Sequence, residues 1–368
     1  KHLAIKHLLV LTVLFWLVGC QPPAEKAQPD VKASVFGQKF GQAVDKKQGL
    51  SFPKDHGAHH QQGIEWWYVT ANLTADNGKE FGVQWTLFRL GTEEKSSLEN
   101  YSNWWNGQLY FAHFAVQSDN QHQAFEKYGR AGQVTIKAQP FTASIDNWSL
   151  TSVNRDTFLP LKLNAKHAEY SAKLSLFDSP LVKHGEQGYS QKTHKGHASY
   201  YYSYPFLNVT GEIQFSGKDY NVTGNAWLDR EWSSSLIDSA QRGWDWFSIQ
   251  ADDESLGGLM AFCIRNTKQE YDYCSASYIN QVGEVKDIKH SDIAMKVLKK
   301  ERFSHDSSDT LSSSYPTEWS LNIKGFDTIL IKAVNADSRN QLNISYWEGR
   351  VKTTGGFIGK GYGELVGY

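Results

Sequence analysis

The sequence predicts an all-β protein built from two consecutive antiparallel β-barrels, which follow an N-terminal signal and a flexible tether. Short runs rich in Val, Ile, Thr, Trp, Tyr and Phe alternate with Gly, Asn, Asp and Ser, and helical periodicity is nearly absent. The acid–indole stretch at residues 65–70 returns in altered form at residues 244–249. A repeat at this distance indicates two related domains, which we place at residues 50–235 and 236–368.

The first domain is predicted to open with a β-hairpin. Residues 66–73 and 81–90 flank Asn77-Gly78, the dipeptide most typical of a two-residue hairpin turn. A later hairpin is expected over the turn at residues 216–219. The other strands are expected at residues 109–117, 133–138, 142–150, 161–164, 171–177, 208–215 and 220–229.

The second domain repeats this style and ends in a glycine-spaced run at residues 361–368, which resembles residues 224–229. Residues 291–302 are expected to form either a short helix or a charged edge. A barrel of about eight strands has an interior just large enough for one small ligand. The remaining strands are expected at residues 244–252, 258–265, 274–279, 319–323, 328–333 and 346–352.

Residues 1–19 are predicted to be a lipoprotein signal peptide. Lys1 and Lys6 precede an apolar run at residues 8–18, which is too short to cross a bilayer as a helix. The run ends in Leu-Val-Gly-Cys, which resembles a bacterial lipobox with Cys20 as the lipidated residue. The alternative is an ordinary secretory signal with a chance cysteine. Gln21 after the cysteine favours an outer-membrane lipoprotein that faces the periplasm of a Gram-negative bacterium.

Residues 20–49 are polar and are expected to tether the folded part to the membrane through acyl chains on Cys20. The net charge of −1 argues against nucleic acid as a partner. The sequence has no nucleotide fingerprint, no phosphate-binding loop and no nucleophile elbow, so we expect no cofactor and no hydrolase triad.

Asp55, His56, His59, His60 and Glu65 gather metal-binding side chains in a short segment, but their spacing fits no standard ligand motif. We therefore expect no metal and interpret the segment as a polar entry loop.

Two cysteines remain in the folded part. Cys263 and Cys274 flank a predicted hairpin turn, and in an oxidising compartment they either pair or stay as two buried thiols.

Glu65 begins a strand of aromatic residues and is a candidate general acid. A carboxyl group desolvated among indoles has a raised pKa, as proton donation at neutral pH requires. The alternative is a purely structural pair with Arg89.

The segment at residues 227–232 supplies two further candidates, Asp229 and Glu231. Alternation along a strand places them on the same face as Trp227. Acids among indoles are costly unless a reaction or a partner uses them. Either they act on a ligand, or Arg230, Arg242 and Asp245 form structural pairs across the domain junction.

Aromatic residues near these acids are candidates for the ligand pocket, since tyrosine offers both an apolar face and a hydroxyl group. The aromatic strand at residues 199–204 could equally pack the interface between the barrels. The predicted ligand-binding residues are Trp66, Trp67, Tyr68, Arg89, Tyr200, Tyr202, Trp227, Arg230, Trp232, Trp244 and Asp245.

The motifs at residues 65–70 and 227–232, together with the closing run at 361–368, resemble the AttH/CrtC family, which includes carotenoid hydratases. The resemblance implies two lipocalin-like domains. In the hydratase branch a matching aspartate protonates an alkene, which implies that role for Asp229 with Glu231 and Tyr202 as helpers. Arg230 and Glu231-Trp232 stand where that branch has histidine and Asn-Trp.

The function expected is binding of a hydrophobic small molecule or lipid, as a carrier that could serve an envelope transporter. The alternative is an acid-assisted hydratase, isomerase or cyclase that acts on an unsaturated lipophilic substrate, with Asp229 as the proton donor.

Overall fold

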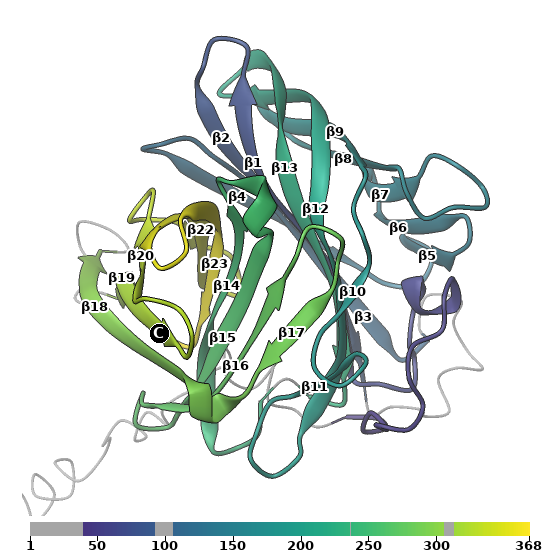
Figure 1. Ribbon diagram of the computed structural model, residues 1–368. Coiled ribbons are helices and arrows are strands. Elements are labelled where there is room, and N and C mark those ends of the chain that lie inside the picture. Colours follow the sequence, from purple (N-terminus) through teal and green to yellow (C-terminus); the bar gives the residue numbers. More distant parts are fainter. Residues whose placement is uncertain (1–39, 93–105, 236, 305–312) are drawn as a thin grey trace, which may run out of the picture.

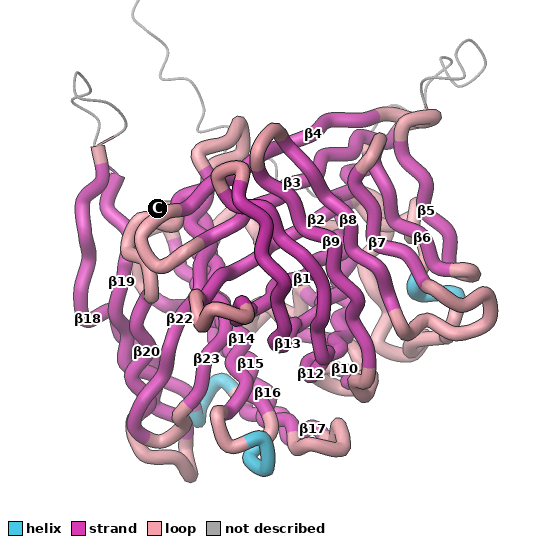
Figure 2. The backbone as a smooth tube through the Cα atoms, turned by 90° about the horizontal axis from the view of Figure 1, so that it is seen from above, coloured by secondary structure: helices cyan, strands magenta, loops and turns pink. Residues whose placement is uncertain are grey.

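The computed structural model describes residues 40–92, 106–235, 237–304 and 313–368, and it consists of two antiparallel β-sheets. Figure 1 shows the first sheet in purple to teal and the second in green to yellow. Viewed from above in Figure 2, the first sheet curls into a nearly closed barrel and the second into a half-barrel. The all-β prediction is confirmed.

The first sheet has 13 strands in the order β4-β3-β2-β1-β13-β12-β9-β8-β7-β6-β5, and β10 and β11 pair with β12. The strands are β1 (Ile64–Ala75), β2 (Glu80–Gly91), β3 (Gln108–Gln117), β4 (His122–Gly129), β5 (Val134–Ala138), β6 (Phe141–Ile145), β7 (Trp148–Ser152), β8 (Leu161–His167), β9 (Tyr170–Phe177), β10 (Val182–Lys183), β11 (Tyr189–Gln191), β12 (Ala198–Phe215) and β13 (Lys218–Ser233).

The second sheet has 10 strands in the order β17-β16-β15-β14-β23-β22-β20-β19-β18, and β21 pairs with β22. Its strands are β14 (Gln241–Ala251), β15 (Gly258–Asn266), β16 (Tyr271–Ile279), β17 (Val285–Ile288), β18 (Ile293–Phe303), β19 (Ser313–Ile323), β20 (Ile329–Ala333), β21 (Arg339–Asn340), β22 (Tyr346–Gly355) and β23 (Gly359–Val366).

Three single-turn 3₁₀ helices complete the described secondary structure: η1 (Lys54–His56), η2 (Glu254–Leu256) and η3 (His290–Asp292). Within the described ranges, no helix has the length and apolar character needed to span a membrane.

The predicted first hairpin is β1–β2, and its turn shows why the sequence folds there. Gly78 has a φ of 82°, a conformation that glycine adopts without the steric cost of a side chain. The turn sets a register in which Glu65 lies opposite Arg89. On the other side of β1, the same residue lies opposite Trp232 of β13.

The structure differs from the sequence-based prediction in two respects and decides between the two alternatives left open for residues 291–302. The strand expected at residues 142–150 is broken into β6 and β7 by a turn in which Asp146 has a φ of 50°. Residues 291–302 contribute mainly to β18, which lies at the edge of the second sheet, so they form the charged edge and not the short helix. Both sheets also have more strands than the eight expected of each barrel, and the second sheet is an open half-barrel.

Three apolar cores hold the molecule together. The interior of the first sheet is filled by large side chains that include Trp67, Trp85 and Trp148. The half-barrel has its own core around Trp319 and Trp347. A third core lies between the two sheets and draws on both. Where the two sheets meet, both faces of β1 are therefore buried.

Side-chain hydrogen bonds also cross the junction between the two sheets. Trp246 Nε1 donates to the hydroxyl of Tyr201 at 3.1 Å. Gln250 Nε2 donates to the carbonyl oxygen of Ala226 at 3.1 Å. Together with the third core, these bonds hold the two sheets in one arrangement.

Candidate functional site

Alternation along β1 separates side chains that face the barrel interior from side chains that face the junction. Glu65 and Trp67 point into the first barrel and are fully buried there. Trp66 and Tyr68 point the other way and line a pocket between the sheets. Successive strand residues face opposite sides, so neighbours in the sequence serve different compartments.

The pocket is bounded by the first sheet on one side and by the half-barrel on the other. It has about 730 Å³ of empty space, part of it open to solvent, a size that suits a small organic ligand. Its walls are mostly aromatic and aliphatic, with three carboxyl groups and one amine among them. The lining residues are Trp66, Tyr68, Phe88, Lys192, Asp229, Glu231, Trp244, Trp246, Phe262, Ile264, Tyr346, Glu364 and Val366.

Asp229 on β13 is the most deeply enclosed acid of this wall, with 3% of its surface exposed. Its carboxyl group accepts hydrogen bonds from Ser203 Oγ, from the Tyr201 hydroxyl at 2.7 Å and from Trp227 Nε1 at 2.6 Å. Burial raises the pKa of Asp229 to about 7, although these hydrogen bonds lower it and the charge of Glu231 adds to the rise. Asp229 can therefore hold or release a proton near neutral pH.

Glu231 lies two residues along the same face and has a different environment. Lys192 Nζ is 2.6 Å from its carboxylate, and Ser199 Oγ donates a hydrogen bond to the same oxygen. The ammonium group also lies 4.2 Å from the centre of the Phe262 ring, where a cation interacts favourably with the aromatic face. Of the two neighbouring acids, Glu231 is thus paired with a cation, whereas Asp229 is held by neutral hydrogen-bond donors.

Glu364 on β23 brings a third carboxyl group from the opposite wall. Trp244 Nε1 donates to it at 2.7 Å. Burial and, to a smaller extent, the charges of Glu231 and Asp229 outweigh the hydrogen bond from Trp244 and raise the pKa of Glu364 to about 7. Two acids that titrate near neutrality therefore face the same apolar space.

Glu348 on β22 extends this acidic group behind the pocket wall. It is fully buried and accepts a hydrogen bond from the hydroxyl of Tyr68, which crosses the junction. Burial and the charge of Glu364 raise the pKa of Glu348 well above its usual value. The environment of Glu348 therefore favours its protonated form.

Glu65, the first acid singled out in the sequence, lies in the barrel interior on the far side of β1 from the pocket. It is paired with Arg89 and Arg230, and the ring and backbone N–H of His59 also contact it. Burial alone would raise its pKa, but Arg89, His59 and Arg230 outweigh burial and hold the pKa well below its usual range. Glu65 is thus an ionised, neutralised charge.

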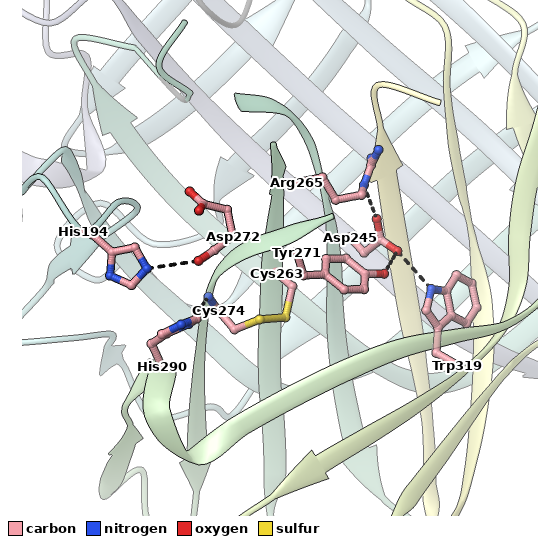
Figure 3. Close-up of a disulfide and its surroundings, with 9 residues drawn as sticks. All are labelled: His194, Asp245, Cys263, Arg265, Tyr271, Asp272, Cys274, His290 and Trp319. Atoms are coloured by element: carbon pink, nitrogen blue, oxygen red, sulfur yellow. Dashed lines mark hydrogen bonds and ion pairs between the residues drawn. A yellow bond between two sulfur atoms is a disulfide. The ribbon is translucent and has the colours of Figure 1, made fainter. Parts of the chain in front are cut away.

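Asp245 has the corresponding place in the half-barrel, as Figure 3 shows. Its carboxylate accepts hydrogen bonds from Arg265 Nε at 3.0 Å, the Tyr271 hydroxyl at 2.6 Å and Trp319 Nε1 at 2.9 Å. The internal repeat therefore preserves a buried acid–arginine pair in each sheet.

The other predicted ligand-binding residues divide by strand face. Tyr202 donates from its hydroxyl to the Asp55 carbonyl and lies 2.7 Å from His56 Nδ1 inside the barrel. The tyrosine that donates a hydrogen bond to Asp229 is thus Tyr201, whereas Tyr202 lies on the opposite face of β12. Those that line the pocket are Trp66, Tyr68 and Trp244, together with Asp229 and Glu231. Those in the first interior are Trp67, Arg89, Tyr200, Tyr202, Arg230 and Trp232, while Trp227 contacts Asp229 in the junction.

Sequence reasoning missed several residues of this site. Glu364 and Val366 are two residues apart on the closing strand and therefore face the same side, so alternation could have predicted that both line the pocket. Trp246 stands in the acid–indole repeat that drew attention to Trp244. No sequence signal marked Lys192, which follows β11 in a loop.

The polar segment before β1 supports the barrel interior. His59 contacts both Asp55, at 3.2 Å, and Glu65, at 3.0 Å, and its ring stacks on Trp232. Within the described ranges, no three His, Cys, Asp or Glu side chains are arranged to hold a metal ion.

Cys263 and Cys274 form a disulfide bond between β15 and β16 (Figure 3). The bond joins residues that lie directly opposite each other in the sheet. Cys20 lies outside the described residues.

Fold and pocket together define an all-β protein of two antiparallel sheets with an acid-lined pocket at their junction. The chain belongs to the AttH-like family, whose model matches residues 43–368. The resemblance noted in the sequence is thereby confirmed.

Two solved structures share this architecture. A structure from Nitrosomonas europaea that carries the AttH name is 32% identical, has a TM-score of 0.78, and matches over 89% of this chain and 99% of its own. Kievitone hydratase from Nectria haematococca is 13% identical, has a TM-score of 0.68, and matches over 90% and 96%. No curated protein sequence matches the chain.

Proposed function

We propose that this protein binds a lipophilic small molecule or lipid in the pocket between its two sheets. The observation that carries the proposal is the composition of the pocket walls, in which aromatic and aliphatic side chains surround about 730 Å³ of empty space. Burial of an apolar ligand against such walls contributes free energy in proportion to the area removed from water.

The polar groups of the pocket indicate how such a ligand is oriented. The ion pair of Lys192 with Glu231 lies on the first-sheet side, and Glu364 lies on the half-barrel side. A ligand with a hydroxyl or carbonyl group near one end can form a hydrogen bond there while its apolar body contacts Trp66, Trp246 or Phe262.

The binding proposal is tested by filling the pocket. Ile264 lines it, and Ile264→Trp adds an indole to the empty space; Leu330→Trp is the matched control, because Leu330 is an exposed residue of β20. We expect the affinity for Nile red, a neutral lipophilic dye, to fall at least ~tenfold for Ile264→Trp, about 1.4 kcal/mol, and to stay unchanged for Leu330→Trp. Equal affinities in both variants would exclude the pocket as the binding site.

A second test asks what the pocket holds in cells. Native mass spectrometry of the protein purified without detergent is expected to show a co-purifying neutral lipophilic molecule, which is lost from Ile264→Trp. A lipophilic molecule retained equally by both tryptophan variants would indicate binding elsewhere on the chain.

A second candidate function is acid-assisted addition of water to the ligand, or its isomerisation. The observation that favours it is the pKa of Asp229, raised by burial to about 7. Asp229 would transfer its proton to one carbon of a C=C bond, whose π electrons form the new C–H bond. Water would then add to the cationic carbon and release a proton to Glu231 or solvent, while aromatic faces such as Trp66 stabilise the cation.

Deuterium incorporation distinguishes the catalyst from the carrier. In D₂O the acidic proton of Asp229 exchanges, so protonation of the ligand would place deuterium on carbon, which mass spectrometry detects. We expect Asp229→Asn to abolish incorporation and to spare affinity. A ligand that stays undeuterated with the unsubstituted protein would leave only the carrier function.

The lipobox adds a location to this proposal. Acyl chains on Cys20 would anchor the protein to the outer membrane on its periplasmic side, where it could exchange a lipid with an envelope transporter. Cys20→Ser is expected to move the protein from the membrane fraction to the soluble periplasm, and membrane retention of this variant would exclude the anchor.

A further inference from the structure

Five side chains form a continuous row of hydrogen bonds from the pocket to the molecular surface. Asp229 accepts from Ser203 Oγ, and Ser203 Oγ lies 2.7 Å from His184 Nε2. The other ring nitrogen, Nδ1, lies 3.0 Å from Ser277 Oγ. Ser277 Oγ donates in turn to Asp287 at 3.1 Å. The row crosses the junction, because Ser203 belongs to the first sheet and Ser277 to the half-barrel.

Exposure to solvent increases along the row from Ser203 to Asp287. Ser203 and His184 are fully buried, and Ser277 is 1% exposed. Asp287, on the edge strand β17, is exposed to solvent. We infer that this row is a proton relay through which the pocket acid Asp229 exchanges its proton with bulk water at Asp287. The inference deepens the second candidate function and rests on Asp229 as the proton donor.

Each step of the relay balances in protons. With Asp229 ionised, a proton that Asp287 takes from water passes to Ser277 Oγ, as Ser277 gives its own proton to His184 Nδ1. His184 releases the proton on Nε2 to Ser203, and Ser203 gives its proton to Asp229. The net result is one proton moved from Asp287 to Asp229, with the ring changed from one neutral tautomer to the other.

The surroundings of His184 favour a neutral imidazole that forms a hydrogen bond at each ring nitrogen. Burial, together with the charge of Lys192, lowers the pKa of His184 to about 3, so the imidazole keeps one N–H and one lone pair. The ring of Tyr201 covers it at 4.2 Å between centroids. At the pocket end, Glu231 and Glu364 are the other acids that act on or respond to Asp229.

A relay matters because a bound apolar ligand would close the direct route from pocket water to Asp229. Asp229 would then regain its proton only through groups on the side of the pocket wall that faces away from the ligand. The row supplies that route without an ionised group between its two carboxyl ends.

The two states of the relay predict different tautomers of His184. When Asp229 is protonated it donates to Ser203, so Ser203 donates to Nε2 and the ring carries its proton on Nδ1. When Asp229 is ionised, Ser203 donates to that buried carboxylate and the ring must donate from Nε2. Ser277 then donates to Nδ1, because the exposed Asp287 can take water in its place.

The test is an NMR titration of ¹⁵N-histidine-labelled protein, in which the His184 signals are those lost in His184→Gln. We expect the ring to change from Nδ1–H below the pKa of Asp229 to Nε2–H above it, without becoming an imidazolium. His113 is the internal control: it is also buried, contacts Tyr346 at 2.9 Å, and stands outside the row, so its tautomer should stay constant. A His184 tautomer that does not respond to pH would overturn the relay.

Three variants test whether the tautomer of His184 responds to Asp229 through the row. Asp229→Asn should abolish the change at His184, whereas Glu364→Gln, which removes the other pocket acid with a pKa of about 7, should preserve it. Ser277→Ala should hold the ring as Nε2–H at every pH, because Nδ1–H would lack a partner. A change that persists in Asp229→Asn or Ser277→Ala would refute the relay. Failure of the proposed function looks different: the ligand stays undeuterated in D₂O while the tautomer still changes.

Discussion

Glu348 and Glu364 lie directly opposite each other on neighbouring strands, so two carboxyl groups share one side of the junction. Like charges in such a pair are destabilising, and neither residue has a cation beside it among the contacts described above. Burial raises the pKa of both, Glu364 to about 7 and Glu348 well above its usual value. The pair is thus stable because at least one member keeps its proton.

We predict that Glu348→Gln changes the free energy of unfolding at neutral pH by less than ~1 kcal/mol, because a neutral amide replaces a neutral acid and still accepts from Tyr68. Glu348→Ala, which leaves that buried hydroxyl without its acceptor, should cost ~1–3 kcal/mol. Urea unfolding measures both. A loss of ~3–5 kcal/mol in the glutamine variant would indicate an ionised Glu348 instead.

The pKa of Asp229 predicts a pH dependence of stability. Its folded value of about 7 lies above the model value of 3.8, so the folded state binds the proton more tightly than the unfolded state. The stability contribution is fully present below the unfolded pKa and is lost as pH rises through about 7. Burying the ionised form costs on the order of 4 kcal/mol at most.

Asp229→Asn removes this dependence, so the variant should gain stability relative to the unsubstituted protein between pH ~4 and ~8. Urea unfolding across that range measures the difference, with Glu301→Gln, a half-buried residue of the edge strand β18, as the control. A difference between Asp229→Asn and the parent that stays constant with pH would show that Asp229 ionises freely in the folded state.

The pKa of Glu65 predicts a pH dependence of stability with the opposite sign. Its pKa is lowered in the fold, so its stabilisation is present above its usual pKa and is lost as acid protonates it. Glu65→Gln leaves Arg89 and Arg230 buried without their carboxylate and should cost ~3–5 kcal/mol at neutral pH. Loss of the solvent-screened Lys299–Glu301 pair in Glu301→Gln should leave the free energy of unfolding nearly unchanged.

Nile red affinity in the same variants separates structure from binding. Because Glu65 lies in the barrel interior, a folded Glu65→Gln protein should bind the dye as the parent does. A change in affinity at full folding would show that the barrel interior communicates with the pocket.

The disulfide between Cys263 and Cys274 is expected to stabilise the half-barrel by about 1–3 kcal/mol, because it closes a short loop in the unfolded chain. Urea unfolding of the Cys263→Ala, Cys274→Ala double variant measures this contribution. Intact mass of the parent should lie two hydrogen masses below that of the reduced protein, and equal masses would contradict the bond.

Much of the architecture was predictable from the sequence. Alternating apolar residues, the Asn77-Gly78 turn and the acid–indole repeat indicated two all-β units, and the family match is consistent with them. Alternation also placed Trp227, Asp229 and Glu231 on a common face, as the structure has them. These features depend on local backbone geometry, which nearby residues determine.

The tertiary structure alone decided which face of each strand meets the pocket. Both faces of β1, of the first half of β12 and of the second half of β13 are buried, one in the barrel and one in the junction, so hydrophobicity does not distinguish them. For that reason Glu65 and Asp229 looked alike in the sequence, although one is neutralised by arginines and the other is the pocket acid. The distinction arises when the second sheet docks on the first, because only that contact creates the pocket and brings Ser277 to His184.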